Sequence, residues 1–145
     1  MRIWTRQATK ADFDFLYALH VAAMRPSIEA TWGWHEPWQR AYFARKWDPA
    51  PRRIIRVDGV DAGVLVLRWE PDALYLSLIE LLPAFQGRGV GTAVLQSLIA
   101  RAAARGLPVT LHVLKANAAA RRFYARHGFA VVADEHVRYK MQRMP

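Results

Sequence analysis

The sequence contains no cysteine. This absence excludes disulfide bonds, thiolate nucleophiles and cysteine metal sites. The histidines show none of the short spacings that are typical of metal-binding helices, such as HxxxH or HExxH. They are His20, His35, His112, His127 and His136. We therefore expect no metal in this protein.

Long apolar runs are also missing. No run approaches the roughly 18 residues that a membrane span requires, and the first residues, Met1–Thr5, lack the apolar stretch of a signal peptide. A length of 145 residues with 53% hydrophobic residues is typical of one globular domain with a sizeable core. We therefore expect a single domain over residues 1–145, a cytoplasmic location and no membrane partner.

Acidic residues are scarce in the second half of the chain. The formal net charge is +9, and residues 73–145 carry 10 Lys and Arg against 3 Asp and Glu. Such an excess attracts a polyanionic ligand, although it also serves solubility. A nucleic-acid partner ranks last, because no five-residue run is wholly basic and no nucleic-acid-binding motif is present.

Glycine is concentrated in one informative stretch, Gln86-Gly87-Arg88-Gly89-Val90-Gly91. A leucine-rich run, Leu74–Leu82, precedes it and reads as a buried strand, and Thr92–Arg105 follows with helical periodicity. Glycines allow backbone N–H groups to turn toward a ligand, and the first turn of a helix adds unpaired N–H donors. The arrangement predicts a site for a phosphorylated cofactor.

Two common nucleotide motifs do not fit this stretch. Gln86 takes the place of the first glycine of GxGxxG, Val90 breaks the frame, and no acidic residue ends the following strand at the expected distance. No Gly-Lys-Ser/Thr of a P-loop follows either. The loop is therefore neither a dinucleotide fingerprint nor a P-loop.

Periodicity, turn residues and capping signals predict alternating strands and helices. We expect strands at Ile3–Gln7, Arg53–Val57, Val60–Trp69, Leu74–Leu82, Val109–Val113, Phe129–Ala133 and Val137–Met144. We expect helices from a capping box at Thr9 to about Met24, from Pro37 to about Trp47, and at Thr92–Arg105 and Asn117–His127. Pro26 is expected to end the first helix, and Gly106 to cap the third helix at its C-terminus. Asp58-Gly59 and Asp134-Glu135 are expected to form the turns between neighbouring strands.

The order of these elements predicts the fold class. The strands Leu74–Leu82 and Val109–Val113, joined through a helix, should be parallel neighbours with a right-handed crossover. The hairpins on either side should be antiparallel. We therefore expect an α/β (α+β) fold with a mixed, mostly antiparallel, twisted sheet of about six to seven strands and helices on both faces.

Two motifs resemble those of a known family. Gln86-x-x-Gly89-x-Gly91 resembles the pyrophosphate loop of the GNAT superfamily of acyl-CoA N-acyltransferases. The segment Asn117–Phe129 resembles the later motif of that family, an Asn, an Ala, a Phe-Tyr pair and a Gly-Phe pair. Leu81-Leu82-Pro83 matches the usual end of the family's fourth strand. The resemblance covers about residues 53–130, and the first 50 residues match only in architecture.

The resemblance implies that acetyl-CoA binds where the fourth and fifth strands splay apart. Backbone groups of Ile79, Leu81 and Leu82 would pair with the pantetheine arm. The pyrophosphate would be held by the loop and the first helical turn, which comprise Gln86, Gly87, Arg88, Gly89, Val90, Gly91 and Thr92. Asn117, Ala120 and Tyr124 would lie beside the rest of the cofactor. No metal is implied.

The same resemblance implies direct transfer to a primary amine without a covalent enzyme intermediate. Tyr124 matches the usual general acid, and a backbone N–H near Leu81-Leu82 would stabilise the oxyanion. Glu80, a carboxylate in an apolar strand, and His112, on the neighbouring strand, are both candidates for the general base. Three alternatives remain open: Tyr124 as a core aromatic, Glu80 as the partner of an arginine, and His112 as a sheet residue bound to a backbone carbonyl.

Recognition of the acceptor is expected from the N-terminal half together with Glu80 and His112. Aromatic residues crowd one segment, at Trp32, Trp34, Trp38, Tyr42, Phe43 and Trp47. They could wall a pocket for an amine, pack a helix onto the sheet, or form a homodimer interface. Glu29 and Glu36 are candidate anchors for an ammonium group. The sequence does not identify the amine.

Three other functions stay open at this point. The enzyme could use another acyl-CoA or an O-linked acceptor. The chain could also be a catalytically silent acyl-CoA-binding sensor, or a basic nucleic-acid-binding module. Loss of CoA-dependent turnover in Tyr124→Phe would separate an enzyme from a sensor.

Overall fold

The computed structural model describes residues 1–145, which divide into two compact units. The first unit comprises residues 1–66 and 78–91, and the second comprises residues 67–77 and 92–145. Each unit therefore contains segments from both halves of the chain. The single domain over residues 1–145 that the sequence suggested stays a prediction.

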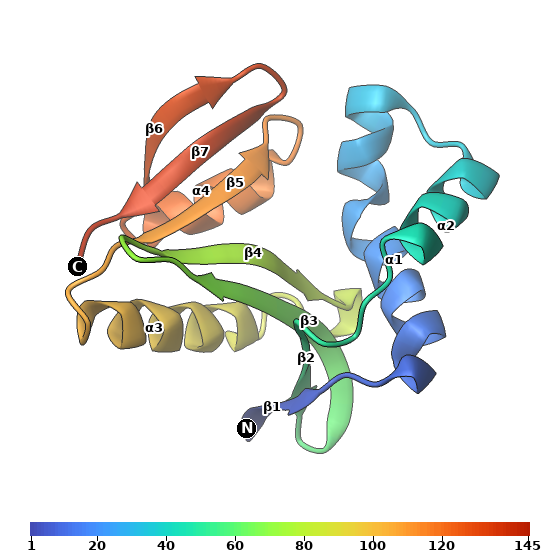
Figure 1. Cartoon of the computed structure of the whole chain (residues 1–145), viewed down its shortest axis with the longest axis horizontal. Coiled ribbons are helices and arrows are strands. Elements are labelled where there is room, and N and C mark those ends of the chain that lie inside the picture. The colour runs from blue at the N-terminus through green and yellow to red at the C-terminus, as the bar shows by residue number, and fades with distance from the viewer. The chain divides into compact units, whose positions relative to one another are not determined.

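The order of elements is the predicted one (Figure 1). The strands are β1 Ile3–Gln7, β2 Arg52–Val57, β3 Val60–Trp69, β4 Leu74–Leu81, β5 Val109–Leu114, β6 Ala130–Glu135 and β7 Arg138–Arg143. The α-helices are α1 Phe13–Trp32, α2 Glu36–Arg45, α3 Val90–Ala103 and α4 Ala118–Arg126. Two short 3₁₀ helices, η1 Lys10–Asp12 and η2 Pro83–Phe85, precede α1 and the glycine loop.

The strands form a seven-stranded sheet in the order β1-β2-β3-β4-β5-β7-β6. The pair β4 and β5 is parallel, with Leu74 opposite Val109 and Leu76 opposite Leu111. The pairs β1/β2, β2/β3, β5/β7 and β6/β7 are antiparallel. The predicted fold class and the parallel pair are therefore confirmed. Nothing in the sequence indicated that β7 would lie between β5 and β6.

The prediction that Pro26 ends the first helix is wrong. Helix α1 continues through Pro26 to Trp32. Proline has a φ that suits a helix and removes one backbone hydrogen bond, so a helix with a packed face can tolerate it. The helix ends instead at Gly33, whose φ is 81° and whose N–H donates to the Glu29 carbonyl at 3.0 Å. Only glycine adopts this left-handed conformation without strain.

Smaller differences lie at element ends, where boundaries are least certain from sequence. Helix α2 begins one residue before Pro37 and ends at Arg45, two residues before the expected end at Trp47. Helix α3 begins at Val90 rather than at Thr92. The last turn was expected at Asp134-Glu135, but both residues belong to β6, and His136, with a φ of 65°, makes the turn.

In the first unit, α1 and α2 pack together and α1 packs on β2 and β3 (Figure 1). The buried cluster comprises Ala8, Leu16, Leu19, Ile54 and Val64, with Phe15, Phe43, Trp47, Val66, Leu78 and Leu82 packed against it. The hairpin of β2 and β3 turns at Asp58 and Gly59, whose φ angles of 50° and 81° fit a type I′ turn.

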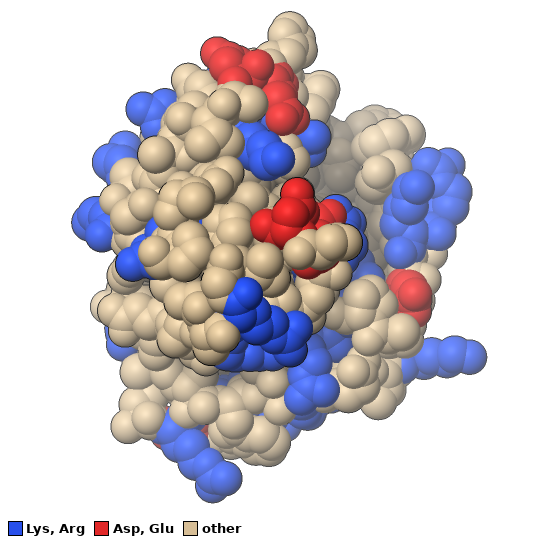
Figure 2. Space-filling model, turned by 60° about the vertical axis from the view of Figure 1, so that its left-hand side comes forward, with Lys and Arg blue, Asp and Glu red and all other residues tan.

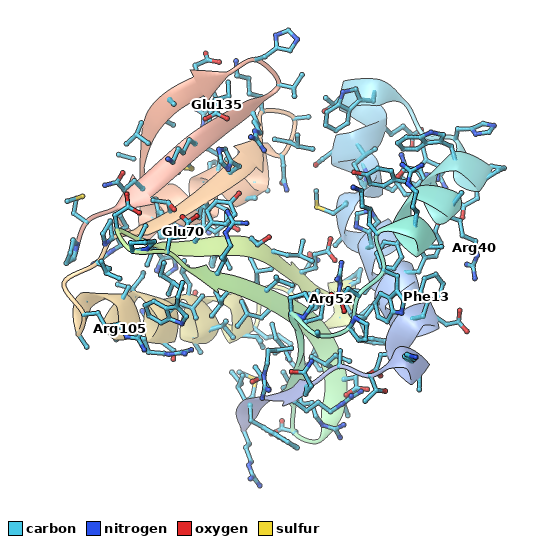
Figure 3. All side chains as sticks on the ribbon, viewed as in Figure 1. Phe13, Arg40, Arg52, Glu70, Arg105 and Glu135 are labelled. Atoms are coloured by element: carbon cyan, nitrogen blue, oxygen red, sulfur yellow. The ribbon has the colours of Figure 1, made fainter.

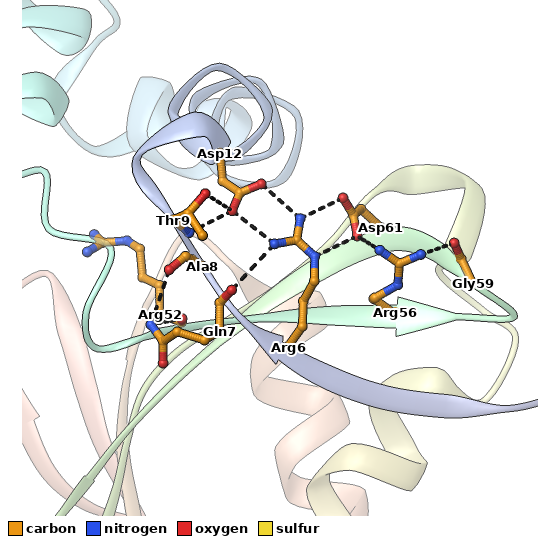
Figure 4. A network of polar contacts seen from close by, with 9 residues as sticks. All are labelled: Arg6, Gln7, Ala8, Thr9, Asp12, Arg52, Arg56, Gly59 and Asp61. Atoms are coloured by element: carbon orange, nitrogen blue, oxygen red, sulfur yellow. Dashed lines mark hydrogen bonds and ion pairs between the residues drawn. The ribbon is translucent and has the colours of Figure 1, made fainter.

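A polar network ties β1 to the start of α1 and to β3 (Figure 4). The Arg6 guanidinium donates to the carboxylates of Asp12 at 2.8 Å and Asp61 at 2.9 Å, and Arg56 also reaches Asp61 at 3.0 Å. Asp12 accepts the Thr9 N–H at 2.8 Å, which forms one half of the predicted capping box. Arg6 is the main cause of a lowered pKa of Asp12.

The second unit contains most of α3, all of α4 and the paired residues of β4/β5, β5/β7 and β6/β7. Its buried side chains include Leu95, Leu98, Ala102, Val109, Leu111, Val113, Phe129 and Met141. Gly106 follows the end of α3 with a φ of 66°, as predicted. The Arg105 guanidinium, labelled in Figure 3, lies 3.9 Å from the centre of the Trp69 ring.

The surface is rich in cationic side chains. On the face shown in Figure 2, Lys and Arg lie in several separate groups, and Asp and Glu form a few small ones. None of the helices combines the length and the apolar composition that are needed to span a membrane.

Candidate active site

The glycine loop leads from η2 directly into α3. Gly87 and Gly89 have φ angles of 71° and 81°, and a Cβ at either position would meet no atom within 4 Å. The loop is therefore open on its outer side and requires glycine for its backbone conformation. Helix α3 begins at Val90, whose side chain is fully buried. The unpaired N–H groups of its first turn therefore lie where the glycine loop ends.

The loop is also fastened to the end of β4. The Gln86 side chain donates to the Leu81 carbonyl at 2.9 Å, and the Gln86 N–H donates to the Pro83 carbonyl at 3.2 Å. The Arg88 guanidinium lies 5.2 Å from the centre of the Phe85 ring. The loop combines open space at its glycines, N–H donors from the first turn of α3 and a fixed connection to β4. These are the features that a diphosphate-binding site requires.

The backbone groups at the end of β4 are not equally free. The Leu82 N–H donates to the Ala62 carbonyl at 2.9 Å, and the Leu82 carbonyl accepts from Phe85 at 2.9 Å. Successive N–H groups of a strand point to opposite edges, so the Leu81 N–H points away from β3. Leu81 is therefore a better candidate than Leu82 for a donor to a ligand.

Glu80 lies on β4 with its carboxylate almost fully enclosed, since its side chain is 2% exposed. The Nδ1 of His20, on α1, lies 3.2 Å from its Oε2. The partner of Glu80 is thus a histidine, where the sequence had suggested an arginine as the structural alternative. The backbone of β3 passes so close to Glu80 at Gly63 that only glycine fits there, because a Cβ would overlap the Glu80 carbonyl oxygen.

No motif in the sequence gave His20 a role. The signal was a polar side chain next to Leu19 on the apolar face of α1. Its ring lies 5.5 Å from the Phe43 ring and 6.5 Å from the Trp34 ring, both measured between centres. Aromatic side chains therefore hold the imidazole beside Glu80.

Arg52, at the start of β2, carries a positive charge that interacts with the charge of Glu80. Burial lowers the pKa of Arg52, while the charges of Asp48 and Glu80 act in the opposite direction. Its guanidinium donates to the Asp48 carbonyl at 2.6 Å, which fixes its position. Arg52, like His20, was not singled out from the sequence.

The aromatic segment divides into packed and exposed members. Phe43 and Trp47 pack on Phe13, with ring centres 5.5 and 5.3 Å apart, which is the packing role that the sequence left open. Trp32 and Trp38 are 64% and 56% exposed, and Trp38 stacks on Tyr42. The Arg40 guanidinium of α2 lies 5.6 Å from the centre of the Phe13 ring of α1. Both residues are labelled in Figure 3.

The two candidate ammonium anchors already have partners. Glu36 accepts from the Tyr17 hydroxyl at 2.7 Å and from the Trp34 indole at 2.8 Å, and these bonds lower its pKa. Burial and the Glu36 contact together raise the pKa of Tyr17 to about 12. Glu29 pairs with Arg25 one helical turn away at 3.1 Å.

His112 lies in the second unit with both ring nitrogens engaged. The Tyr75 hydroxyl lies 2.7 Å from Nδ1, and Glu135 Oε1 lies 3.2 Å from Nε2. An ionised carboxylate only accepts, so Nε2 donates to Glu135 and Nδ1 accepts from Tyr75 in the neutral imidazole. His112 is thus satisfied by side chains and not by the backbone carbonyl that the sequence suggested.

The partners of His112 are themselves fixed. Burial opposes the ionisation of Glu135, but hydrogen bonds from His112 and Arg138 outweigh it and lower the pKa of Glu135. Burial raises the pKa of Tyr75. In the chain Tyr75–His112–Glu135, one proton therefore lies on the Tyr75 hydroxyl, a second lies on Nε2 of the neutral imidazole, and the negative charge lies on Glu135.

The later motif forms α4. Asn117 is its N-cap, and the Asn117 side-chain oxygen accepts from the Ala120 N–H at 3.2 Å. Tyr124 is 8% exposed, with its ring 5.5 Å from Phe123 and 5.7 Å from Phe129. Burial raises the pKa of Tyr124 to about 12, so its hydroxyl is a proton donor at neutral pH.

One further polar contact joins the start of α3 to the end of α4. The Thr92 hydroxyl, in the first turn of α3, lies 3.4 Å from Nε2 of His127 at the end of α4. No group of three or more His, Asp or Glu side chains is arranged to hold a metal ion.

A comparison with protein families decides which family these elements represent. Residues 13–129 match the Acetyltransferase (GNAT) family. The chain belongs to this GNAT family. The resemblance that the two motifs carried is thereby confirmed. The match begins at Phe13 and so includes α1 and α2, where the sequence motifs showed a likeness of architecture only.

The curated relatives are themselves uncharacterised. The GNAT chain is 38% identical over 86 residues to an uncharacterized N-acetyltransferase of Mycobacterium bovis and to one of Mycobacterium tuberculosis. The aligned residues make up 56% of this chain and 55% of each relative. The chain thus spans about half the length of the curated relatives that it matches.

Solved structures share the GNAT fold over the whole chain. The PaiA N-acetyltransferase of Thermoplasma acidophilum, solved in complex with coenzyme A, has a TM-score of 0.81 at 16% identity and full coverage of both chains. Arabidopsis thaliana Naa50, solved with a bisubstrate analogue, has a TM-score of 0.67 at 16% identity and full coverage of both chains. At such identities these structures show the fold alone.

Proposed function

We propose that this chain is an N-acetyltransferase that moves an acetyl group from acetyl-CoA directly to a primary amine. Membership of the GNAT family supports the reaction class. The observation that carries the proposal is the open glycine loop at the start of α3, which only the short helix η2 separates from the strand that bears Glu80.

The donor would be held mainly by backbone groups. In this proposal the N–H groups from Gly87 to Thr92 hold the pyrophosphate, and Gln86 keeps the loop in place through the Leu81 carbonyl. Ile79 and Leu81 offer backbone groups to the pantetheine arm. Asn117 caps α4 and Ala120 is small, which suits the positions beside the cofactor that the family motif gives them.

The chemistry requires a stabilised oxyanion and a proton for the leaving sulfur. Acetyl-CoA supplies the activated thioester carbonyl when it is bound. The Leu81 N–H is our candidate donor to the developing oxyanion. The Tyr124 hydroxyl donates a proton to the departing thiolate, and its pKa of about 12 keeps that proton in place across the working pH range.

Glu80 is the general base in this proposal. It is a buried carboxylate whose direct partner is one histidine, His20. His112 is the weaker candidate, because its proton-accepting nitrogen already faces the Tyr75 hydroxyl. A carboxylate with a free oxygen can take a proton from an ammonium group without first breaking an existing hydrogen bond.

A calorimetric titration of acetyl-CoA tests the donor site. We expect micromolar binding to the wild type and no measurable binding to Gly89→Glu, which places a negative charge in the loop. Gly33→Glu is the matched control, because Gly33 has the same φ of 81° and equally open space for a Cβ. Binding by the control and not by Gly89→Glu would support the site.

Release of the CoA thiol with a panel of amines then tests the reaction. No binding of acetyl-CoA to the wild type would overturn the proposed donor site and the enzyme with it. Binding without thiol release, for any amine in the panel, would favour the acyl-CoA-binding sensor instead.

A further inference from the structure

We infer that His20 is a positioning residue for Glu80: the Nδ1–H of His20 holds one carboxylate oxygen, and the other oxygen is left to take the proton of the acceptor ammonium. The inference deepens the proposed function and rests on it, because it takes Glu80 as the general base. It concerns four elements of the first unit: α1, α2, β2 and β4.

The hydrogen bond between the two side chains has one direction. Nδ1 of His20 lies 3.2 Å from Oε2 of Glu80. An ionised carboxylate only accepts hydrogen bonds, so Nδ1 carries the proton of this bond. Because the Glu80 side chain is 2% exposed, water supplies little of the hydrogen bonding that its charge requires. His20 is therefore the donor on which the enclosed carboxylate depends.

The two carboxylate oxygens of Glu80 differ in their surroundings. Oε2 is bound to His20, whereas Oε1 makes no hydrogen bond with another group of the chain. The one side-chain nitrogen or oxygen atom that is both fully buried and without a partner is Nε of Arg56, so Oε1 retains some contact with solvent. Oε1 is therefore the oxygen that a substrate ammonium can approach.

Aromatic packing holds the imidazole in one orientation. The ring centres of Phe43 and Trp34 lie 5.5 and 6.5 Å from that of His20. The indole N–H of Trp34 donates to Glu36, and the guanidinium of Arg25 lies 5.3 Å from the centre of the Trp34 ring. Neither aromatic ring offers an acceptor that would compete for the Nδ1 proton.

The other charge that acts on Glu80 comes from β2. Arg52 interacts with Glu80 through its charge, and its guanidinium donates to the Asp48 carbonyl. From β3, Gly63 faces Glu80 with its backbone alone. A positive charge favours the ionised carboxylate, but without a hydrogen bond it does not fix the direction of the two oxygens. His20 thus supplies an orientation that Arg52 does not.

The role requires no proton transfer between the two side chains. One N–H bond of the acceptor ammonium breaks as an O–H bond forms on Oε1 of Glu80, and the neutral amine attacks the thioester. Oε1 then releases this proton to water, and Nδ1 of His20 keeps its own proton throughout. Both side chains end the cycle with their starting charges.

Two replacements separate the hydrogen bond from the packing. His20→Asn keeps an N–H donor near the position of Nδ1, whereas His20→Phe keeps an aromatic ring and removes the donor. With saturating acetyl-CoA and an accepted amine, we expect kcat to fall about tenfold or more in His20→Phe and to stay within about threefold of the wild type in His20→Asn. The KM for acetyl-CoA should stay unchanged in both. The acidic limb of the pH–rate profile should move to higher pH in His20→Phe alone, because a buried carboxylate without a donor is harder to ionise.

A role in packing alone predicts the opposite order, since a phenyl ring would preserve the contacts with Phe43 and Trp34 and an amide would not. A His20→Phe enzyme with the kcat and pH profile of the wild type, or equal losses in the two variants, would overturn the inference. His35→Asn and His35→Phe are the matched controls and should behave as the wild type does. His35 is exposed, and its side chain makes no capping hydrogen bond.

A measurement on the resting protein tests the hydrogen bond without turnover. Long-range ¹H–¹⁵N NMR spectra distinguish protonated from unprotonated ring nitrogens, and the signals of His20 are those that His20→Asn lacks. We expect a proton on Nδ1 at neutral pH, and an unprotonated Nδ1 would overturn the inference. If the wild type released no thiol with any amine, the proposed function would fail even with this proton in place, so the two failures are distinguishable.

Discussion

The two units each place a histidine beside a glutamate, and the two pairs differ in which member is buried. In the first unit the Glu80 carboxylate is enclosed and His20 is the more exposed partner. In the second unit Glu135 is 36% exposed and His112 is the more enclosed, between Tyr75 and Glu135. An enclosed carboxylate with one partner can take part in proton transfer, whereas an enclosed imidazole with two partners is already satisfied.

This comparison explains why the general base could not be identified from residue type and strand position alone. Glu80 and His112 both lie in apolar strands, and both are reasonable bases by chemistry. What separates them is the set of hydrogen bonds that each has already made. His112 would have to give up the 2.7 Å contact with Tyr75 before it could accept a proton from a substrate.

The largest effect is expected from Glu80→Gln. Loss of the general base should lower kcat by roughly 100-fold or more, because the amide cannot accept the ammonium proton. The pH–rate profile should also lose the limb that belongs to this base. His112→Gln, which removes the other candidate, provides the comparison and should change kcat far less. An unchanged profile in Glu80→Gln, with a large loss in His112→Gln, would reverse the roles of the two units.

The next effect is expected from Tyr124→Phe, which tests the acid of the second unit. Removal of the hydroxyl should lower kcat by about 10- to 100-fold and leave acetyl-CoA binding intact in the titration. The raised pKa of about 12 means that the hydroxyl loses its proton only above the assay range. The wild type should therefore show no fall in rate from Tyr124 between pH 8 and about 10. A basic limb in that range that Tyr124→Phe abolishes would contradict this assignment.

A smaller effect is expected from Gly63→Ala, which tests how the fold holds Glu80. The added methyl group would overlap the Glu80 carbonyl oxygen and lie 2.7 Å from a Leu81 methyl carbon. We expect the free energy of unfolding to fall by about 2 kcal/mol, measured by urea denaturation. A loss of less than about 0.5 kcal/mol would mean that close packing at Glu80 does not hold this part of the sheet.

The smallest effect is expected from Tyr75→Phe. This change frees the accepting nitrogen of His112 and should cost about 1 kcal/mol of stability, as a typical hydrogen bond does. We expect kcat to change less than about threefold, because His112 is not the base in the proposed reaction. A loss as large as that of Glu80→Gln, in the same thiol-release assay, would show that the second unit carries the base.

Most elements could be predicted because their signals are local. The Asp58-Gly59 turn, the glycine loop and Gly106 after α3 each depend on a few adjacent residues whose backbone preferences are strong. Pro26 was read by the same local rule, and the rule failed. Packing of the longer α1, which ends only at Gly33, outweighed the loss of one backbone hydrogen bond.

The candidate site could be predicted only in part. Recognisable short motifs supplied the loop and Tyr124, and titratable side chains in apolar strands supplied Glu80 and His112. The sequence did not indicate which side chains would form hydrogen bonds with Glu80 and His112. His20 lies 60 residues before Glu80, and Tyr75 lies 37 residues before His112, so no local pattern could connect them.

By itself, then, the sequence determined the family, the order of the elements and the open glycine loop, because short-range backbone preferences and spaced motifs encode them. Only the tertiary structure decided which polar groups meet. It enclosed Glu80 with His20, engaged both nitrogens of His112, and joined the Leu82 N–H to Ala62, which leaves Leu81 as the better donor. These contacts depend on helix packing and strand register over long chain separations, and they determine which side chains remain available to a substrate.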